Sequence, residues 1–155
     1  DDKRVSDEFE FEVVLHLIEQ GAKVILDEGF GEDEIERTER LIDRLKARGK
    51  TIMRVNGNLA FIEELKPDLI TYNGGIGQFA ALISRSQFYV GYDSMGQHVA
   101  AALEIPELVV FNGYPTEKFS WKWHPYGKGK IKIIHAEGKA EKDVLESTKK
   151  ILSVL

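Results

Sequence analysis

The clearest strand–turn–helix pattern in the chain is Phe88-Tyr89-Val90-Gly91-Tyr92-Asp93-Ser94-Met95-Gly96-Gln97-His98-Val99-Ala100-Ala101-Ala102-Leu103. A short apolar run breaks off into polar and flexible residues, and an Ala-rich amphipathic segment follows. The predicted helix would begin next to two capping side chains, Asp93 and Ser94. A glycine at Gly96 and an imidazole at His98 follow in its first turns. The unpaired N–H groups of a helix N-terminus bind anions, so the turn is a candidate anion site. An ordinary helix cap without a ligand is the alternative.

Strand and helix patterns alternate along the rest of the chain. Strands are expected at 24–26, 51–55, 69–72, 108–111 and 131–134. Helices are expected from Ser6 to Gly21, from Gly31 to Gly49, at 59–65 and 76–84, and from about Ala140, with a loop at 112–130. On the helix at 95–103, we expect Val99, Ala102 and Leu103 to face the core. The alternation predicts an α/β fold, a three-layer Rossmann-like domain over residues 1–155 with a mainly parallel sheet. Ligands bind such sheets beyond the carboxyl ends of the strands.

Composition narrows the function further. With 155 residues, of which 43% are hydrophobic, the chain has the length of one well-cored domain and no apolar run long enough for a membrane span. A net charge of −5 argues against general nucleic-acid binding, although a basic patch lies between Lys118 and Lys132. The absence of cysteine excludes disulfides and thiol chemistry and fits a cytoplasmic protein. His16, His124 and His135 have no metal-site spacing, so no metal or other cofactor is expected.

A resemblance to a known family rests on five residues of the first turn: Asp93, Ser94, Gly96, Gln97 and His98. Followed by an Ala-rich helix, they resemble the diphosphate motif of glycosyltransferase family 9, the ADP-heptose:lipopolysaccharide heptosyltransferases. In that family the glycine usually follows the serine directly, whereas here Met95 intervenes. The resemblance implies that the backbone N–H groups from Met95 to Gln97 and the Ser94 hydroxyl face the donor phosphates. Asp93 would order the turn, because a carboxylate repels phosphate.

The resemblance also implies two site residues outside this turn. Family members carry a lysine in a polar loop before the first helix of the donor domain, and Lys3 lies at that place, with Arg4 as a near substitute. An acidic residue after the first strand of this chain would bond the nucleotide ribose. Glu34 or Glu32 would be that residue, although carboxylates also stabilise a helix N-terminus without any ligand.

For the whole chain, the resemblance implies the donor-binding half of a GT-B glycosyltransferase. Such enzymes transfer a sugar with inversion from a nucleotide-diphosphate donor, here to a lipopolysaccharide-type acceptor, without an essential metal. The general base lies in the N-terminal acceptor domain, so we expect this chain alone to bind donor without turnover. The start at Asp1-Asp2-Lys3-Arg4, with no strand before the first helix pattern, is typical of a piece of a larger protein.

Two other interpretations remain open from the sequence. The segment Gly75-Ile76-Gly77-Gln78-Phe79-Ala80 fits G-x-G-x-x-A after a strand, which suggests a dinucleotide-dependent oxidoreductase or, more simply, a tight turn and close helix packing. A nucleotide-binding module without transfer activity is the second interpretation.

Near the C-terminus, the aromatic residues from Trp121 to Tyr126 could stack on a sugar or base, or simply cover the sheet.

Overall fold

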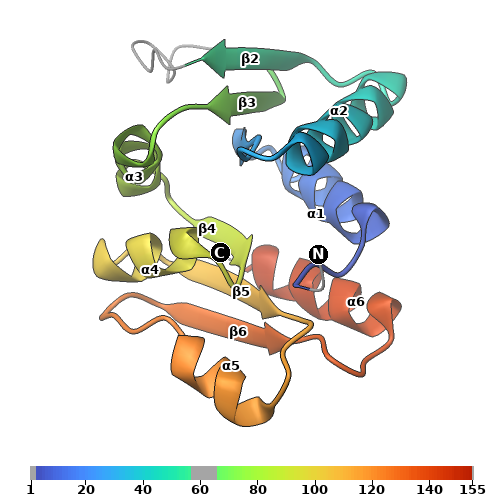
Figure 1. Ribbon diagram of the computed structural model, residues 1–155. Coiled ribbons are helices and arrows are strands. Elements are labelled where there is room, and N and C mark those ends of the chain that lie inside the picture. Colours follow the sequence, from blue (N-terminus) through green and yellow to red (C-terminus); the bar gives the residue numbers. More distant parts are fainter. Residues whose placement is uncertain (1–2, 57–65, 155) are drawn as a thin grey trace. The chain divides into compact units, whose positions relative to one another are not determined.

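The computed structural model describes residues 3–56 and 66–154 and is shown in Figure 1. The chain forms two compact units. The first unit is Ser6–Gln78, and the second unit combines Asp1–Val5 with Phe79–Leu155. Both units contain parallel strands connected by helices, which confirms the predicted α/β fold class. The prediction of one domain over residues 1–155 stays a prediction.

The first unit has a three-stranded parallel sheet in the order β1-β3-β2. Figure 1 shows β2 and β3 of this sheet side by side. Its elements are α1 (Asp7–Glu19), β1 (Val24–Asp27), α2 (Glu32–Ala47), β2 (Ile52–Asn56) and β3 (Leu69–Asn73). Helix α1 begins where the Ser6 side chain accepts a hydrogen bond from the Phe9 N–H at 2.9 Å. The core lies between α1, α2 and the sheet, and comprises Phe11, Val14, Leu15, Ile18, Leu41, Ile42, Leu45 and Leu69. Apolar residues at helical spacing on α1 and α2 therefore form most of this core.

The second unit repeats the arrangement with the order β4-β5-β6, again parallel (Figure 1). Helix α3 (Ile76–Ser84) precedes β4 (Tyr89–Tyr92), α4 (Met95–Ala102), β5 (Glu107–Phe111), α5 (Glu117–Trp123), β6 (Ile131–His135) and α6 (Glu141–Leu152). All five residues of the central strand β5 are buried. Because the three strands are parallel, the turns after Tyr92, Phe111 and His135 meet at one edge of the sheet.

Two sequence predictions are wrong in the second unit. Residues 112–130 are not all loop, because they contain α5, whose Thr116 hydroxyl accepts a hydrogen bond from the Phe119 N–H at 3.2 Å. The core-facing side of α4 is also different from the predicted one, since Ala102 and Leu103 are exposed. Its buried residues are Gly96, Gln97, Ala100 and Ala101. The helix predicted at 59–65 lies outside the described residues.

The described residues were also searched for membrane spans. Within 3–56 and 66–154, none of the helices combines the length and the apolar character needed to cross a bilayer.

Candidate functional site

The turn between β4 and α4 lies at the carboxyl edge of the second unit's sheet. Ser94 is the N-cap of α4, with extended backbone angles (φ −149°, ψ 177°) and an exposed side chain. Among the described residues, its hydroxyl makes no capping hydrogen bond. The first N–H groups of an α-helix have no partner within the helix. The hydroxyl and the start of α4, from Met95 on, can therefore both serve a ligand.

Asp93 is buried beneath this turn and bonds to two other parts of the site. Its Oδ1 accepts a hydrogen bond from Nε2 of Gln97 at 2.9 Å. Its Oδ2 lies 3.0 Å from Nζ of Lys3, and the same ammonium group donates to the Asp93 carbonyl oxygen at 3.3 Å. The carboxylate is therefore paired with Lys3 and bonded to Gln97, and it holds these parts of the turn together. That it orders an anion site stays a prediction.

The segment that carries Lys3 is held at the same edge by a second contact. Nδ2 of Asn112, the residue after β5, donates to the carbonyl oxygen of Arg4 at 2.7 Å. Lys3 is about half exposed, so its ammonium group keeps access to solvent while it contacts Asp93. The fold brings Lys3 and Asp93 together from positions 90 apart, and Arg4 and Asn112 from positions 108 apart, which a local pattern cannot reveal.

Gln97 is completely buried in the first turn of α4 and connects it to α5. Besides Asp93, its Nε2 donates to the backbone carbonyl oxygen of Trp123 at 3.1 Å. Within the described part of the chain, its Oε1 has no hydrogen-bond partner. The sequence prediction named Gln97 as a site residue and counted Trp123 among the aromatic residues that could stack on a sugar or base, but it missed the contact between the two. The signal that could have located α5 is the N-cap at Thr116.

His98 follows on α4 and is exposed. Its ring centroid lies 6.3 Å from that of Trp123, at an interplanar angle of 56°. Its Nε2 also lies 3.4 Å from Nε2 of Gln97, so the exposed ring has neighbours in α4 and α5. Contact with a ligand stays a prediction.

Gly96 lies close to the side chain of Tyr89. It is buried, and a Cβ atom added there would lie 2.1 Å from Oη of Tyr89 on β4. A Cβ at Gly91 would meet the same phenol at 2.4 Å. The two glycines make room for the Tyr89 ring next to the turn. A contact of Gly96 with a ligand stays a prediction.

Glu34 belongs to the first unit, at the start of α2. Its Oε2 accepts hydrogen bonds from the N–H groups of Phe30 at 2.9 Å and Gly31 at 3.2 Å. Gly29 has a positive φ of 75°, and a Cβ there would overlap the Glu34 carboxylate. The side chain thus caps its own helix in this structure. Its contact with a ribose stays a prediction, as does the choice between Glu34 and Glu32.

The glycine-rich turn before α3 is closed by its own polar groups. The Gly75 N–H donates to Oε1 of Gln78 at 3.1 Å, and the Tyr72 hydroxyl lies 3.3 Å from the same oxygen. A Cβ at Gly74 would collide with the Tyr72 hydroxyl. These contacts favour a tight turn and helix packing over a dinucleotide site.

Two histidines lie among aromatic rings near the ends of β5 and β6. The rings of His124 and His135 are 5.3 Å apart, and Phe111 lies 5.1 Å from His124. Burial lowers the pKa of His124, and the nearby His135 lowers it further. Burial and the charge of Lys139 likewise lower the pKa of His135. The residues that the structure describes contain no group of three or more His, Cys, Asp or Glu side chains that could hold a metal ion.

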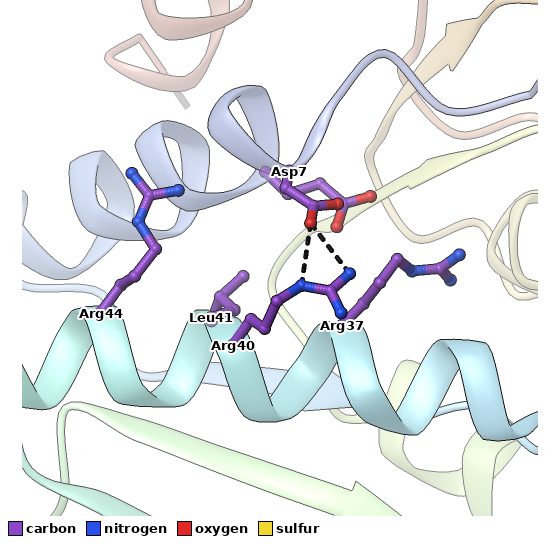
Figure 2. Close-up of a pocket in the computed structure, with 6 residues that line it drawn as sticks. Asp7, Arg37, Arg40, Leu41 and Arg44 are labelled. Carbon is purple, nitrogen blue, oxygen red and sulfur yellow. Dashed lines mark hydrogen bonds and ion pairs between the residues drawn. The ribbon is translucent and has the colours of Figure 1, made fainter.

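A small cavity of about 190 Å³ lies elsewhere, between α1 and α2 of the first unit (Figure 2). Three arginines line it, and each is paired: Arg40 with Asp7 at 3.0 Å, Arg44 with Glu8 at 2.7 Å, and Arg37 with Glu34 at 3.9 Å. Because carboxylates already pair with these arginines, we interpret the cavity as part of the salt-bridged contact between α1 and α2 and not as an anion site. None of the predicted site residues lines it.

The second unit is thus a parallel α/β structure in which a helix N-terminus, a serine and a lysine gather at the carboxyl edge of the sheet. The chain belongs to glycosyltransferase family 9 (heptosyltransferase), whose family model matches residues 6–152. Family membership was predicted from Asp93 to His98 and is confirmed.

Comparison with solved structures gives the same fold. The chain is similar to E. coli heptosyltransferase WaaC with ADP, with 21% sequence identity and a TM-score of 0.71 over 99% of this chain. It is also similar to E. coli heptosyltransferase WaaC with ADP-2-deoxy-2-fluoro heptose, with 21% identity, a TM-score of 0.67 and the same coverage of this chain. The chain spans only 40% and 39% of those two chains. None of the curated proteins compared with this chain matches it.

Proposed function

We propose that this chain is the donor-binding domain of an inverting glycosyltransferase. The enzyme transfers a sugar, heptose-like in chemistry, from a nucleotide-diphosphate donor to a glycan or lipopolysaccharide-type acceptor. The observation that carries the proposal is the contact of Lys3 with Asp93 beside the N-terminus of α4. Membership of the heptosyltransferase family and likeness to structures that hold ADP support it.

The chemistry of the site suits a leaving diphosphate. As the bond between sugar and phosphate breaks, negative charge grows on the diphosphate. The start of α4 offers backbone N–H groups and the positive end of a helix dipole. Ser94 adds a hydroxyl donor. The half-exposed ammonium group of Lys3 has three N–H donors, so it can contact a phosphate while it stays paired with Asp93. Asp93 holds Lys3 in place. Because Lys3 compensates the charge of the Asp93 carboxylate, that carboxylate repels the phosphates only weakly.

The chain contains no residue to which we assign the general base. We assign that role to an N-terminal acceptor-binding domain of the same protein, in keeping with the 40% share of WaaC that this chain spans. The chain alone then binds donor without turnover, and the two domains together form a GT-B enzyme of the cytoplasm. A nucleotide-binding module without transfer activity would bind the same donor, and turnover by the two-domain protein distinguishes the two.

Calorimetric titration of the 155-residue chain with ADP, UDP, GDP and NADH tests donor binding. We expect a nucleoside diphosphate to bind, ADP first among them, and His98→Ala and Ser94→Ala to weaken its binding by about tenfold. Ser147→Ala, an exposed serine on α6, is the matched control and should leave the affinity unchanged. Binding of NADH alone, indifferent to both variants, would contradict the proposal and favour Gly75–Ala80; so would no binding of any nucleotide.

A further inference from the structure

Trp123 presents a large apolar ring next to the proposed phosphate site. The residue, at the end of α5, is 48% exposed. Its ring centroid lies 6.3 Å from that of His98 on α4 and 6.1 Å from that of Phe119 on its own helix. A fully buried aromatic side chain covers about 150–250 Å², and about half of Trp123 is still open to a partner.

The position of Trp123 relative to the start of α4 is fixed by hydrogen bonds. The buried Gln97 amide donates both to Asp93 Oδ1 at 2.9 Å and to the carbonyl oxygen of Trp123 at 3.1 Å. Asp93 in turn contacts Lys3. A continuous chain of polar contacts thus joins Lys3, the turn before α4 and the end of α5. These bonds hold the backbone at residue 123, and the ring itself lies next to His98 and Phe119. A side chain on a backbone held in this way needs less ordering when a ligand arrives.

The other tryptophan of α5 has different neighbours. The Trp121 ring packs on that of His124 at 4.9 Å, and the Tyr126 hydroxyl reaches the Trp121 carbonyl oxygen at 3.5 Å. Two residues that are two positions apart on a helix do not share a face. Trp121 is 62% exposed, so exposure alone does not distinguish the two tryptophans, whereas the contact with His98 does.

We infer that Trp123 is a ligand-binding residue that stacks on a ring of the nucleotide sugar whose diphosphate lies at the start of α4. This inference rests on the proposed function and names a residue that the diphosphate motif does not contain. Two rings flank the diphosphate of such a donor, the nucleobase with its ribose on one side and the transferred sugar on the other. Both offer a weakly polar face that packs on an indole.

Tryptophan fluorescence tests the inference, because the chain has two tryptophans. Trp121→Phe leaves Trp123 as the only reporter, and Trp123→Phe leaves Trp121. Each variant is titrated with ADP and then with ADP-glucose. We expect a saturable change in the emission of Trp123, with the same Kd as calorimetry, and no change for Trp121. A response to ADP assigns the stacked ring to the nucleobase side, and a response to ADP-glucose alone assigns it to the sugar.

Calorimetry of two alanine variants gives a second measurement. The ligand that changes the Trp123 emission, ADP or ADP-glucose, should bind Trp123→Ala about tenfold more weakly than the original chain. Its affinity for Trp121→Ala should stay within about twofold of that for the original chain. The hydrogen bond from Gln97 goes to the backbone carbonyl of residue 123, so the substitution removes the ring and leaves that acceptor in place. Far-UV circular dichroism confirms that each variant is folded.

The outcomes separate the two proposals. If ADP or ADP-glucose binds in calorimetry while Trp123 emission and the affinity of Trp123→Ala are unchanged, this inference is wrong and donor binding stands. If neither ligand binds the original chain, the proposed function is wrong and this inference with it. Should Trp123→Ala fail to fold, the emission of the Trp121→Phe variant decides the matter alone.

Discussion

The carboxylate of Asp93 accepts a hydrogen bond from the side-chain amide of Gln97, four residues further along the chain, at 2.9 Å. Both residues are buried, and the bond spans the point at which β4 ends and α4 begins. The turn that presents the start of α4 is thus fixed from below by a pair of side chains. The exposed Ser94 is left to face solvent or a ligand.

Replacing Asp93 should destabilise the fold as well as the site. Asp93→Ala leaves the buried Gln97 amide without one acceptor, and we expect the free energy of unfolding to fall by about 2 kcal/mol. Loss of the half-exposed Lys3 contact adds little. Urea denaturation measures the change, with Glu146→Ala on the exposed face of α6 as the control. Equal stability of the two variants would show that the Asp93–Gln97 bond does not hold the turn.

Gly96→Ala should destabilise the chain because its Cβ would lie 2.1 Å from the Tyr89 hydroxyl. We expect a loss of about 1–3 kcal/mol, as for other overpacked sites. Gly77→Ala is the matched control, since it also lies in a helix, yet a Cβ there meets no described atom within 4 Å. The control should gain about 0.5–1 kcal/mol. A stabilising Gly96→Ala variant would contradict the role assigned to the Tyr89 ring.

Glu107 should make stability depend on pH between about 4.5 and 7. The residue is fully buried, both carboxylate oxygens lack a hydrogen-bond partner in the described residues, and burial raises its pKa from 4.5 to about 7. In this window the folded chain keeps a proton that the unfolded chain releases. The free energy of unfolding therefore falls as pH rises, by at most about 1.4 kcal/mol per pH unit, and levels off above pH 7.

Two histidines change the free energy of unfolding with pH in the opposite direction, so the experiment must separate their effect from that of Glu107. His124 and His135 have lowered pKa values, so the unfolded chain binds protons more readily below pH 6.5 and acid destabilises the fold. The difference between the original chain and Glu107→Gln, measured by urea denaturation at each pH, isolates Glu107. The variant should gain relative stability from pH 5 to pH 7. A difference that does not change with pH would contradict this assignment.

The affinities for ADP and pyrophosphate can show whether Glu34 or Glu32 contacts the ribose. Glu34→Ala should cost about 1 kcal/mol of stability, because its carboxylate caps the N–H groups of Phe30 and Gly31. If Glu34 also hydrogen-bonds the ribose, the Glu34→Ala variant should bind ADP about tenfold more weakly and pyrophosphate with unchanged affinity. Glu32→Ala, also in the first turn of α2, is the control. Loss of ADP affinity in Glu32→Ala alone would transfer the ribose contact to that residue.

Local signals in the sequence predicted the turn at 93–98 because an apolar strand, two capping residues and an Ala-rich helix follow one another there. The same reasoning missed α5, a helix of seven residues that is too short for a periodic pattern and is followed by Pro125 and Gly127. It also misplaced the buried side of α4, because a polar residue such as Gln97 is not expected in a core, whereas here it is fully buried and bonded to Asp93 and Trp123.

Contacts between distant parts of the chain could not be predicted from local patterns. Lys3 and Asp93 are 90 positions apart, and only the resemblance to a family placed both at one site. Trp123 reaches α4 through its backbone carbonyl, an acceptor that every residue type offers. Its position follows from the packing of α5 and not from its identity.

The most direct test of the account is to observe where ADP contacts the chain. We would record amide ¹H–¹⁵N spectra of the uniformly labelled chain during titration with ADP. The account predicts that the largest shifts fall on the amides of Met95, Gly96 and Gln97 at the start of α4, and that they shrink in Ser94→Ala. Saturable binding with shifts confined to Gly75–Gln78, or to the arginine-lined cavity between α1 and α2, would contradict it.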